Sequence, residues 1–244
     1  MNNKNTIEYT YTFRFKSGQE KKFQVKLDEA TLALIPSGVS QKPEWARLDF
    51  FPCNNCPLQG TLKYCPVAAN LSHLVEEFKD TISYEETLVT VESPERTYIK
   101  KTSVQKGLSS IIGIYMSTSN CPVLDKLRPT VRFHLPFATT TETVYRMVSM
   151  YLLAQYFRSH NGNKPDTELN GLIEIYKAVS EVNKGISRRI SHASEKDANV
   201  NAVVILHSLG DSIPFFIETG LDEIKNFFLP YLSENKAEQN DRTD

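Results

Sequence analysis

The stretch Ile7–Phe15, IEYTYTFRF, alternates bulky apolar and polar side chains, which is the period of a β-strand with one buried face. A Lys-Ser-Gly turn follows it, and Lys22–Leu27 repeats the alternation. The two runs therefore predict a β-hairpin. A second hairpin is predicted where Thr87–Val91 and Arg96–Thr102 flank a Ser-Pro-Glu turn, and Trp45–Phe51 predicts a further strand.

In the remaining segments the apolar residues recur at intervals of three and four, the spacing of amphipathic helices. The run ending at His160 is apolar on nearly every side from Met147 to Phe157, so we expect it to be the central helix of the core. The last run is expected to break near Pro214 and Gly220. The predicted helical runs are Leu71–Phe78, Val104–Tyr115, Thr141–His160, Leu169–Ile190, Asp197–Leu209 and Ile213–Leu232.

This order of elements predicts an α+β fold in one domain, residues 1–232. A β-rich N-terminal half made of hairpins, about residues 1–102, is expected to pack on a C-terminal helical bundle, about residues 103–232. We find no internal repeat and no low-complexity linker that would divide the chain. The polar segment 233–244 predicts a disordered tail.

Composition narrows the classes of partner. The 244 residues carry a formal net charge of −1, so the overall charge indicates neither nucleic acid nor an anionic membrane as the partner. A protein partner stays open. The N-terminus lacks the pattern of a secretory signal, and no apolar run approaches the roughly 18 residues that span a bilayer. We therefore expect a soluble, cytoplasmic protein, in which cysteines are thiols or metal ligands rather than disulfides.

The four cysteines predict a single metal site. Cys53 and Cys56 form a C-x-x-C motif, Cys65 follows nine residues later, and Cys121 comes from a distant segment. Two thiolates separated by two residues can face one ion, and distant ligands complete a tetrahedral shell in many zinc sites. Every cysteine of the chain is assigned to this site, and Zn²⁺ is the favoured ion.

Three of these cysteines stand directly before proline, which is favoured at the first position of a helix. Cys56, Cys65 and Cys121 are therefore each expected at a helix N-cap. The positive end of a helix lowers the pKa of a thiol toward the thiolate that binds metal. Dipoles that converge in this way favour an anionic centre.

Other uses of the cysteines stay open at this point. They could be four buried, unreactive side chains, because free cysteine packs as a small hydrophobe. Cys53 and Cys56 could form a redox pair. An iron–sulfur cluster is the alternative cofactor, since Cys-Pro also follows cluster ligands in ferredoxins.

At these residues the chain resembles a family of uncharacterised bacterial proteins. The shared pattern is Cys-x-x-Cys-Pro-Leu, then Cys-Pro-Val-Ala and a helix, then Cys-Pro before a Phe-His-Leu-Pro-Phe segment. The matching stretches are Cys53–Leu58, Cys65–Phe78, Cys121–Phe137 and Tyr145–Phe157, so the resemblance extends over most of the chain. It implies a shared fold and shared cysteines, and no activity.

A second group of candidate residues follows Cys121. Arg128, Arg132 and His134 fall at alternate positions of a segment that we interpret as extended, so they are expected on one face near the metal. Such a face could bind a carboxylate or phosphate, and His134 could act as a ligand or an acid–base group. The alternative is a solvated strand face.

The usual catalytic signatures are missing, including the Gly-x-Ser-x-Gly elbow, the phosphate-binding loop and the His-Glu-x-x-His motif. The sequence therefore favours a non-catalytic metal-binding protein with a regulatory or interaction role. The alternative hypothesis is a thiol-based redox sensor, or an unfamiliar enzyme with an Arg- and His-lined pocket beside the cysteines.

Overall fold

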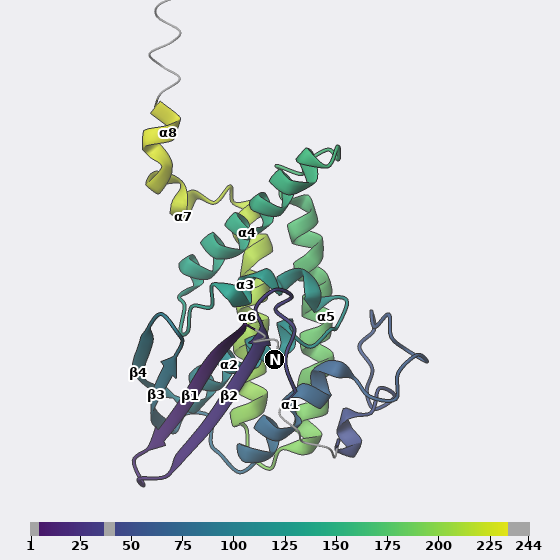
Figure 1. Cartoon of the computed structure of the whole chain (residues 1–244), viewed down its shortest axis with the longest axis vertical. Helices are drawn as coiled ribbons and strands as arrows, with labels where there is room; N and C mark the ends of the chain where they lie inside the picture. The colour runs from purple at the N-terminus through teal and green to yellow at the C-terminus, as the bar shows by residue number, and fades with distance from the viewer. Residues whose placement is uncertain (1–4, 37–41, 234–244) are drawn as a thin grey trace, which may run out of the picture.

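The sheet of the N-terminal half has four antiparallel strands in the order β2-β1-β3-β4 (Figure 1). The computed structural model describes residues 5–36 and 42–233. Both predicted hairpins are confirmed, and β1 lies at the centre because it pairs with β2 and with β3. The strands are β1 Thr6–Phe15, β2 Glu20–Asp28, β3 Glu86–Glu92 and β4 Thr97–Ser103.

One face of this sheet forms the main hydrophobic core. The alternation along β1 buries Tyr11 and Phe13 completely. The Phe13 ring packs edge-on against Phe78, the C-cap residue of helix α1 (Pro66–Glu77), with ring centroids 5.0 Å apart. Gly107 of helix α2 (Val104–Ser117) leaves room for the same ring, since a Cβ there would lie 2.7 Å from Phe13 Cε1. The α+β class is therefore confirmed.

Helices make up the C-terminal half. Helix α6 (Ala198–Glu218) packs beside α2 and α5 (Asn170–Ala193) (Figure 1). It also contacts α4 (Thr140–His160), so it connects the helices next to the sheet with those farther from it. A capping box of Thr139 and Glu142 begins α4, as both side chains hydrogen-bond to the other residue's backbone N–H. The remaining helices are α3 Pro129–Arg132, α7 Asp222–Lys225 and α8 Leu229–Ser233.

The predicted strand over Trp45–Phe51 is wrong. The segment contains a 3₁₀ turn, η1 (Glu44–Ala46), and one isolated bridge between Arg47 and Tyr64. Its carbonyl groups accept hydrogen bonds from the Arg189 side chain of α5 instead of from a neighbouring strand. The segment therefore packs against helix α5 and is not part of the sheet.

Two predictions about the helices also fail. The break expected near Pro214 is wrong, because α6 continues through this residue, whereas the break near Gly220 is confirmed: α6 ends at Glu218 and Gly220 has the left-handed φ of +73°. α4 is peripheral rather than central, because it buries Val144, Met147 and Tyr151 in a second, smaller hydrophobic cluster while Phe157 on its outer face is 58% exposed. The predicted tail begins at the end of α8, and residues 234–244 lie outside the described part of the chain.

Within residues 5–36 and 42–233, α6 is the one helix long and apolar enough to cross a membrane. Its most apolar window has a mean hydropathy of 1.5, and 22% of that window is buried. A single such helix is weak evidence for a membrane span, because core helices of soluble proteins have the same composition.

Candidate functional site

The four cysteines come from three segments and meet in the main core. Cys53 and Cys56 lie in the loop between η1 and α1, Cys65 is the N-cap of α1, and Cys121 follows α2. Cys53, Cys65 and Cys121 are buried, and Cys56 is half-buried against them. All four are free thiols.

These thiols lie within electrostatic range of one another. Burial raises the pKa of Cys53 to about 12, and the negative charges of Cys65, Cys56 and Cys121 raise it further. Burial likewise raises the pKa of Cys121, and the charges of Cys65 and Cys56 act in the same direction. Folding therefore brings thiols from three segments within range of one another's charge.

Helix N-termini meet this cluster in two of the three predicted places. Pro66 is the first residue of α1, directly after Cys65. Backbone N–H groups of Leu124 and Val123, at the start of the 3₁₀ turn η2 (Leu124–Leu127), donate toward the Cys121 sulfur and lower its pKa. Cys56 precedes a turn rather than a helix.

The thiols of the described structure do not form a complete metal coordination shell. Among residues 5–36 and 42–233, no three Cys, His, Asp or Glu side chains already form a group that could hold a metal ion. The Cys53 thiol instead lies 3.9 Å from the carbonyl oxygen of Val182 on α5. Gly185 makes room for it, because a Cβ at that position would lie 2.5 Å from the Cys53 sulfur.

A buried arginine lies beside the thiols. The sequence did not predict it as a site residue. Arg189 is 1% exposed and donates hydrogen bonds to the carbonyl oxygens of Trp45, Arg47 and Leu48. Its positive charge lowers the pKa of Cys53. In the described part of the chain, no carboxylate lies within ion-pair distance of it. Its place in the apolar stripe of α5, next to Ile190, is the sequence signal that could have identified it.

The segment from Arg128 to His134 is not extended, so these residues do not share one face. Pro129 begins the helical turn α3, so the segment lacks the alternation of a strand, and the two arginines bind different partners. Arg128 pairs with Asp125 and hydrogen-bonds to Asn120, and Arg132 faces Glu95 at 3.7 Å. Of the predicted anion-binding residues, only His134 reaches a pocket.

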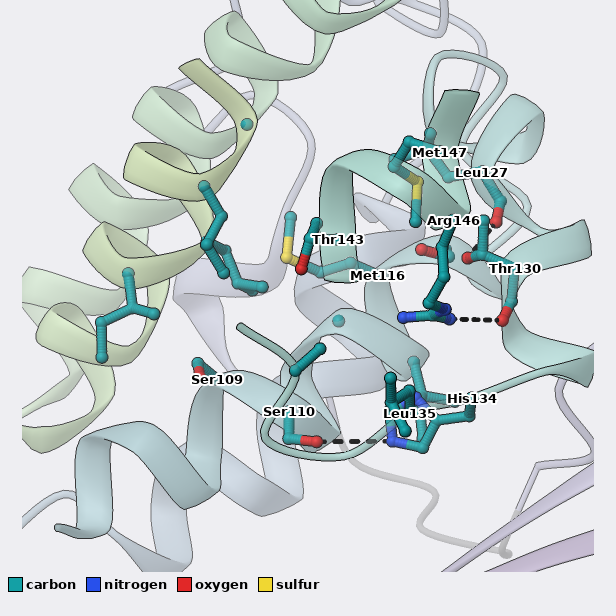
Figure 2. A pocket seen from close by; sticks show the side chains of 18 of the residues that line it. Ser109, Ser110, Met116, Leu127, Thr130, His134, Leu135, Thr143, Arg146 and Met147 are labelled. Carbon is teal, nitrogen blue, oxygen red and sulfur yellow. Dashed lines mark hydrogen bonds between the residues drawn. The ribbon is translucent and has the colours of Figure 1, made fainter. Parts of the chain in front are cut away.

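That pocket is a cavity of about 470 Å³ bounded by α2, α3, α4, α5 and α6 (Figure 2). Arg146 of α4 extends into it, and its Nη2 atom donates to the carbonyl oxygens of Thr130 at 3.0 Å and Phe133 at 2.9 Å. Burial lowers the pKa of Arg146. Nothing in the sequence marks this residue as part of a site, because an arginine in a helix is ordinarily exposed to solvent.

His134 forms the floor of the cavity next to α2. Its Nε2 atom lies 2.5 Å from the Tyr11 hydroxyl and 3.4 Å from the Ser110 hydroxyl, and the two hydroxyls are 2.8 Å apart. Burial, with a smaller effect of the Arg146 charge, lowers the pKa of His134 to about 3. The imidazole is therefore neutral near pH 7 and is a weak general base toward Ser110.

Comparison with known proteins identifies the family. A family model described as "Domain of unknown function (DUF6901)" matches residues 9–229. The chain belongs to this family. The match covers most of the chain and agrees with the predicted resemblance to an uncharacterised family. It does not establish the cysteine pattern of the DUF6901 family. No curated protein and no solved structure matches the chain.

Proposed function

We propose that this DUF6901 protein binds a metal ion through Cys53, Cys56, Cys65 and Cys121, at a non-catalytic site that stabilises the fold. The observation that carries the proposal is the buried Arg189 guanidinium beside the thiols, which forms no ion pair in the described chain and interacts only at longer range with Asp49, a partner of Arg47. A buried charge is strongly unfavourable unless another charge compensates it. Thiolates bound to a metal would supply that compensation.

The donor set fits zinc. Four thiolates around Zn²⁺ form a closed tetrahedral shell that carries a net charge of −2, the sign that Arg189 and the N–H groups at Cys121 would stabilise. An iron–sulfur cluster would use the same four ligands and remains the alternative cofactor. Neither requires a residue outside the cysteine cluster.

The geometry gives less support to a redox sensor. A reactive thiol needs a lowered pKa and access to solvent. Cys53 and Cys121 are buried and their pKa values are raised. Coordination, in which the metal displaces the thiol protons, fits such a site better than thiol exchange in the reducing cytoplasm that we expect for this protein.

The proposed metal would join three parts of the chain. Cys53 and Cys56 belong to the loop that packs on α5. Cys65 is the N-cap of α1, and Cys121 lies in the segment that follows α2. A metal that binds the folded state alone adds its binding free energy to folding. The regulatory or interaction role expected from the sequence would then belong to surfaces that this core supports.

Metal content is the direct test. Protein purified without added metal is analysed for its elements, and its visible absorption spectrum is recorded. We expect about one zinc per chain and a colourless protein, whereas iron with visible charge-transfer bands would identify the cluster instead. Protein that contains neither and does not take up zinc or iron after reduction contradicts the proposal.

Thermal melting tests the structural role. Chelation should lower the melting temperature of the natural protein, and Cys65→Ser should lower it to a similar value. The Cys65→Ser protein is the matched control, because a chelator should not destabilise it further. Equal melting temperatures of the metal-bound and chelated natural protein would exclude a structural role.

A further inference from the structure

The cavity has a cationic lining that is partly apolar and partly hydroxyl-bearing. Its basic residues are Arg146 inside and Lys100 and Lys106 from β4 and α2, and none of its described lining residues is Asp or Glu. Aliphatic side chains from α2, η2, α4 and α6 alternate with serine and threonine hydroxyls. Its volume of about 470 Å³ lies within the range of pockets that hold small organic molecules.

Polar side chains in this lining lack protein partners. Tyr176 is 6% exposed and Asn183 is 3% exposed, and both line the cavity from α5. Neither side chain has a hydrogen-bond partner within the described residues. Buried polar groups are nearly always hydrogen-bonded, so these two side chains offer free hydrogen-bonding groups to a molecule or water inside the cavity. Ser117 of α2, which is 8% exposed, is in the same situation.

Backbone carbonyls hold Arg146 in place, and Glu142, one turn earlier on α4, acts on its charge without forming an ion pair. The Arg146 Nη2 atom is held by the carbonyl oxygens of Thr130 and Phe133, which fixes the plane of the guanidinium. Nε and Nη1 have no partner in the described chain, and no described carboxylate lies within ion-pair distance. Figure 2 shows the guanidinium bonded to Thr130 and lying above His134, which is itself linked to Ser110 of α2. The Tyr176 hydroxyl is close enough for the Arg146 charge to act on it.

We propose that this cavity binds a small organic carboxylate with an apolar body. The carboxylate would accept hydrogen bonds from Arg146 and from the Tyr176 hydroxyl, and the apolar body would lie against Leu124, Met147 and Leu206. Asn183 lies seven residues after Tyr176, about 10 Å along the helix at 1.5 Å per residue, and would bind a second polar group of the ligand.

A carboxylate fits better than a phosphate. A guanidinium forms paired hydrogen bonds with a planar carboxylate, and a single fixed arginine suits a single charge. A phosphate group is typically bound by several donors, often including the free N–H groups of a helix N-terminus. The helix N-terminus nearest the cavity is that of α4, and Glu142 and Thr139 already occupy its cap.

This inference is independent of the proposed metal site. No cysteine lines the cavity, and Arg146 has no part in the cysteine cluster. Loss of metal and loss of carboxylate binding can therefore be measured separately on the same protein.

The test uses calorimetric titration of the full chain with decanoate and 2-naphthoate, which represent a flexible and a rigid apolar body. 1-Decanol and 2-naphthol serve as uncharged counterparts, and decyl phosphate tests the other head group. We expect at least one carboxylate to bind about tenfold more tightly than its uncharged counterpart and more tightly than decyl phosphate. Failure of both carboxylates to bind at millimolar concentration overturns the proposal, as does equal binding of acids and uncharged counterparts.

Variants assign the binding to the cavity. Arg146→Gln should weaken carboxylate binding about tenfold or more, while Arg158→Gln, at an exposed position of the same helix, should leave it unchanged. Tyr176→Phe removes one hydroxyl and should weaken binding about threefold to tenfold, which keeps the test valid if Arg146→Gln fails to fold. Unchanged affinity in Tyr176→Phe and in a folded Arg146→Gln protein would show that the carboxylate binds elsewhere.

Discussion

Two buried arginines define two different environments in this molecule. Arg189 lies under the cysteine loop, almost completely buried, and donates to three carbonyl oxygens of that loop. Arg146 lies in the cavity, donates to two carbonyl oxygens and keeps further donors free. Neither forms an ion pair with a described carboxylate, although Asp49 acts on Arg189 and Glu142 on Arg146 at longer range, so each cation can accept a closer anionic partner.

The two arginines differ in the source of the anion that would bind them. The thiols near Arg189 belong to the chain itself, and their charge becomes available when they are deprotonated. The lining of the Arg146 cavity contains no acidic residue among those described, so its anion must come from outside. The first arginine is therefore expected to act on stability and the second on binding.

Replacement of the two arginines should give the largest contrast. Arg189→Leu leaves three buried carbonyl oxygens without donors and should lower the free energy of unfolding by about 3–5 kcal/mol. Arg146→Leu should cost about 1 kcal/mol without ligand, because the Phe133 carbonyl that it releases is exposed. Urea unfolding measures both values, and limited proteolysis should cut the loop at residues 44–65 only in Arg189→Leu. Equal losses of stability would remove the distinction between the two regions.

A pair of glycines sharpens the comparison in the cysteine region. Gly185→Ala places a Cβ against the Cys53 sulfur and should cost about 1–3 kcal/mol despite the better helix propensity of alanine. Gly113→Ala is the matched control, since its nearest neighbour would be Leu206 at 3.6 Å, an ordinary contact. We expect the control to be neutral or more stable by up to about 1 kcal/mol. If Gly185→Ala also proves neutral in thermal unfolding, the loop is less tightly packed on α5 than the structure indicates.

The smallest effect concerns acid sensitivity at the cavity. The pKa of His134 falls to about 3 in the folded protein, below its ordinary value near 6.5, so only the unfolded chain takes up this proton between those values. The stability that His134 contributes is present above pH 6.5 and is lost as the pH falls toward 3, by at most about 1.4 kcal/mol per pH unit.

Urea unfolding at pH 7.5 and pH 5.5 should therefore show a loss of about 1.4 kcal/mol that is absent in His134→Gln. His160→Gln, at an exposed position, should keep the full loss. An unchanged pH dependence in His134→Gln would mean that the imidazole is protonated in the folded protein.

The sequence alone determined the local elements. Alternation predicted both hairpins of the sheet, and the three- and four-residue spacing predicted α1, α2, α4 and α5, because these periods depend on backbone geometry that each segment carries with it. The proline after Cys65 likewise predicted the start of α1. The cysteines could be named as a group because no other residue of their kind exists in the chain.

Only the tertiary structure decided which polar residues are buried and what they face. Arg146 has the sequence signature of a surface arginine, whereas Arg189 differs only in its place within the apolar stripe of α5. Arg128 and Arg132, which the sequence favoured, each pair with a carboxylate outside the cavity. The apolar surface of α4 predicted a central helix, yet α6 lies between α2 and α5 and leaves Phe157 exposed. Periodicity shows that a helix has an apolar face, but burial depends on the partners that other segments bring to it.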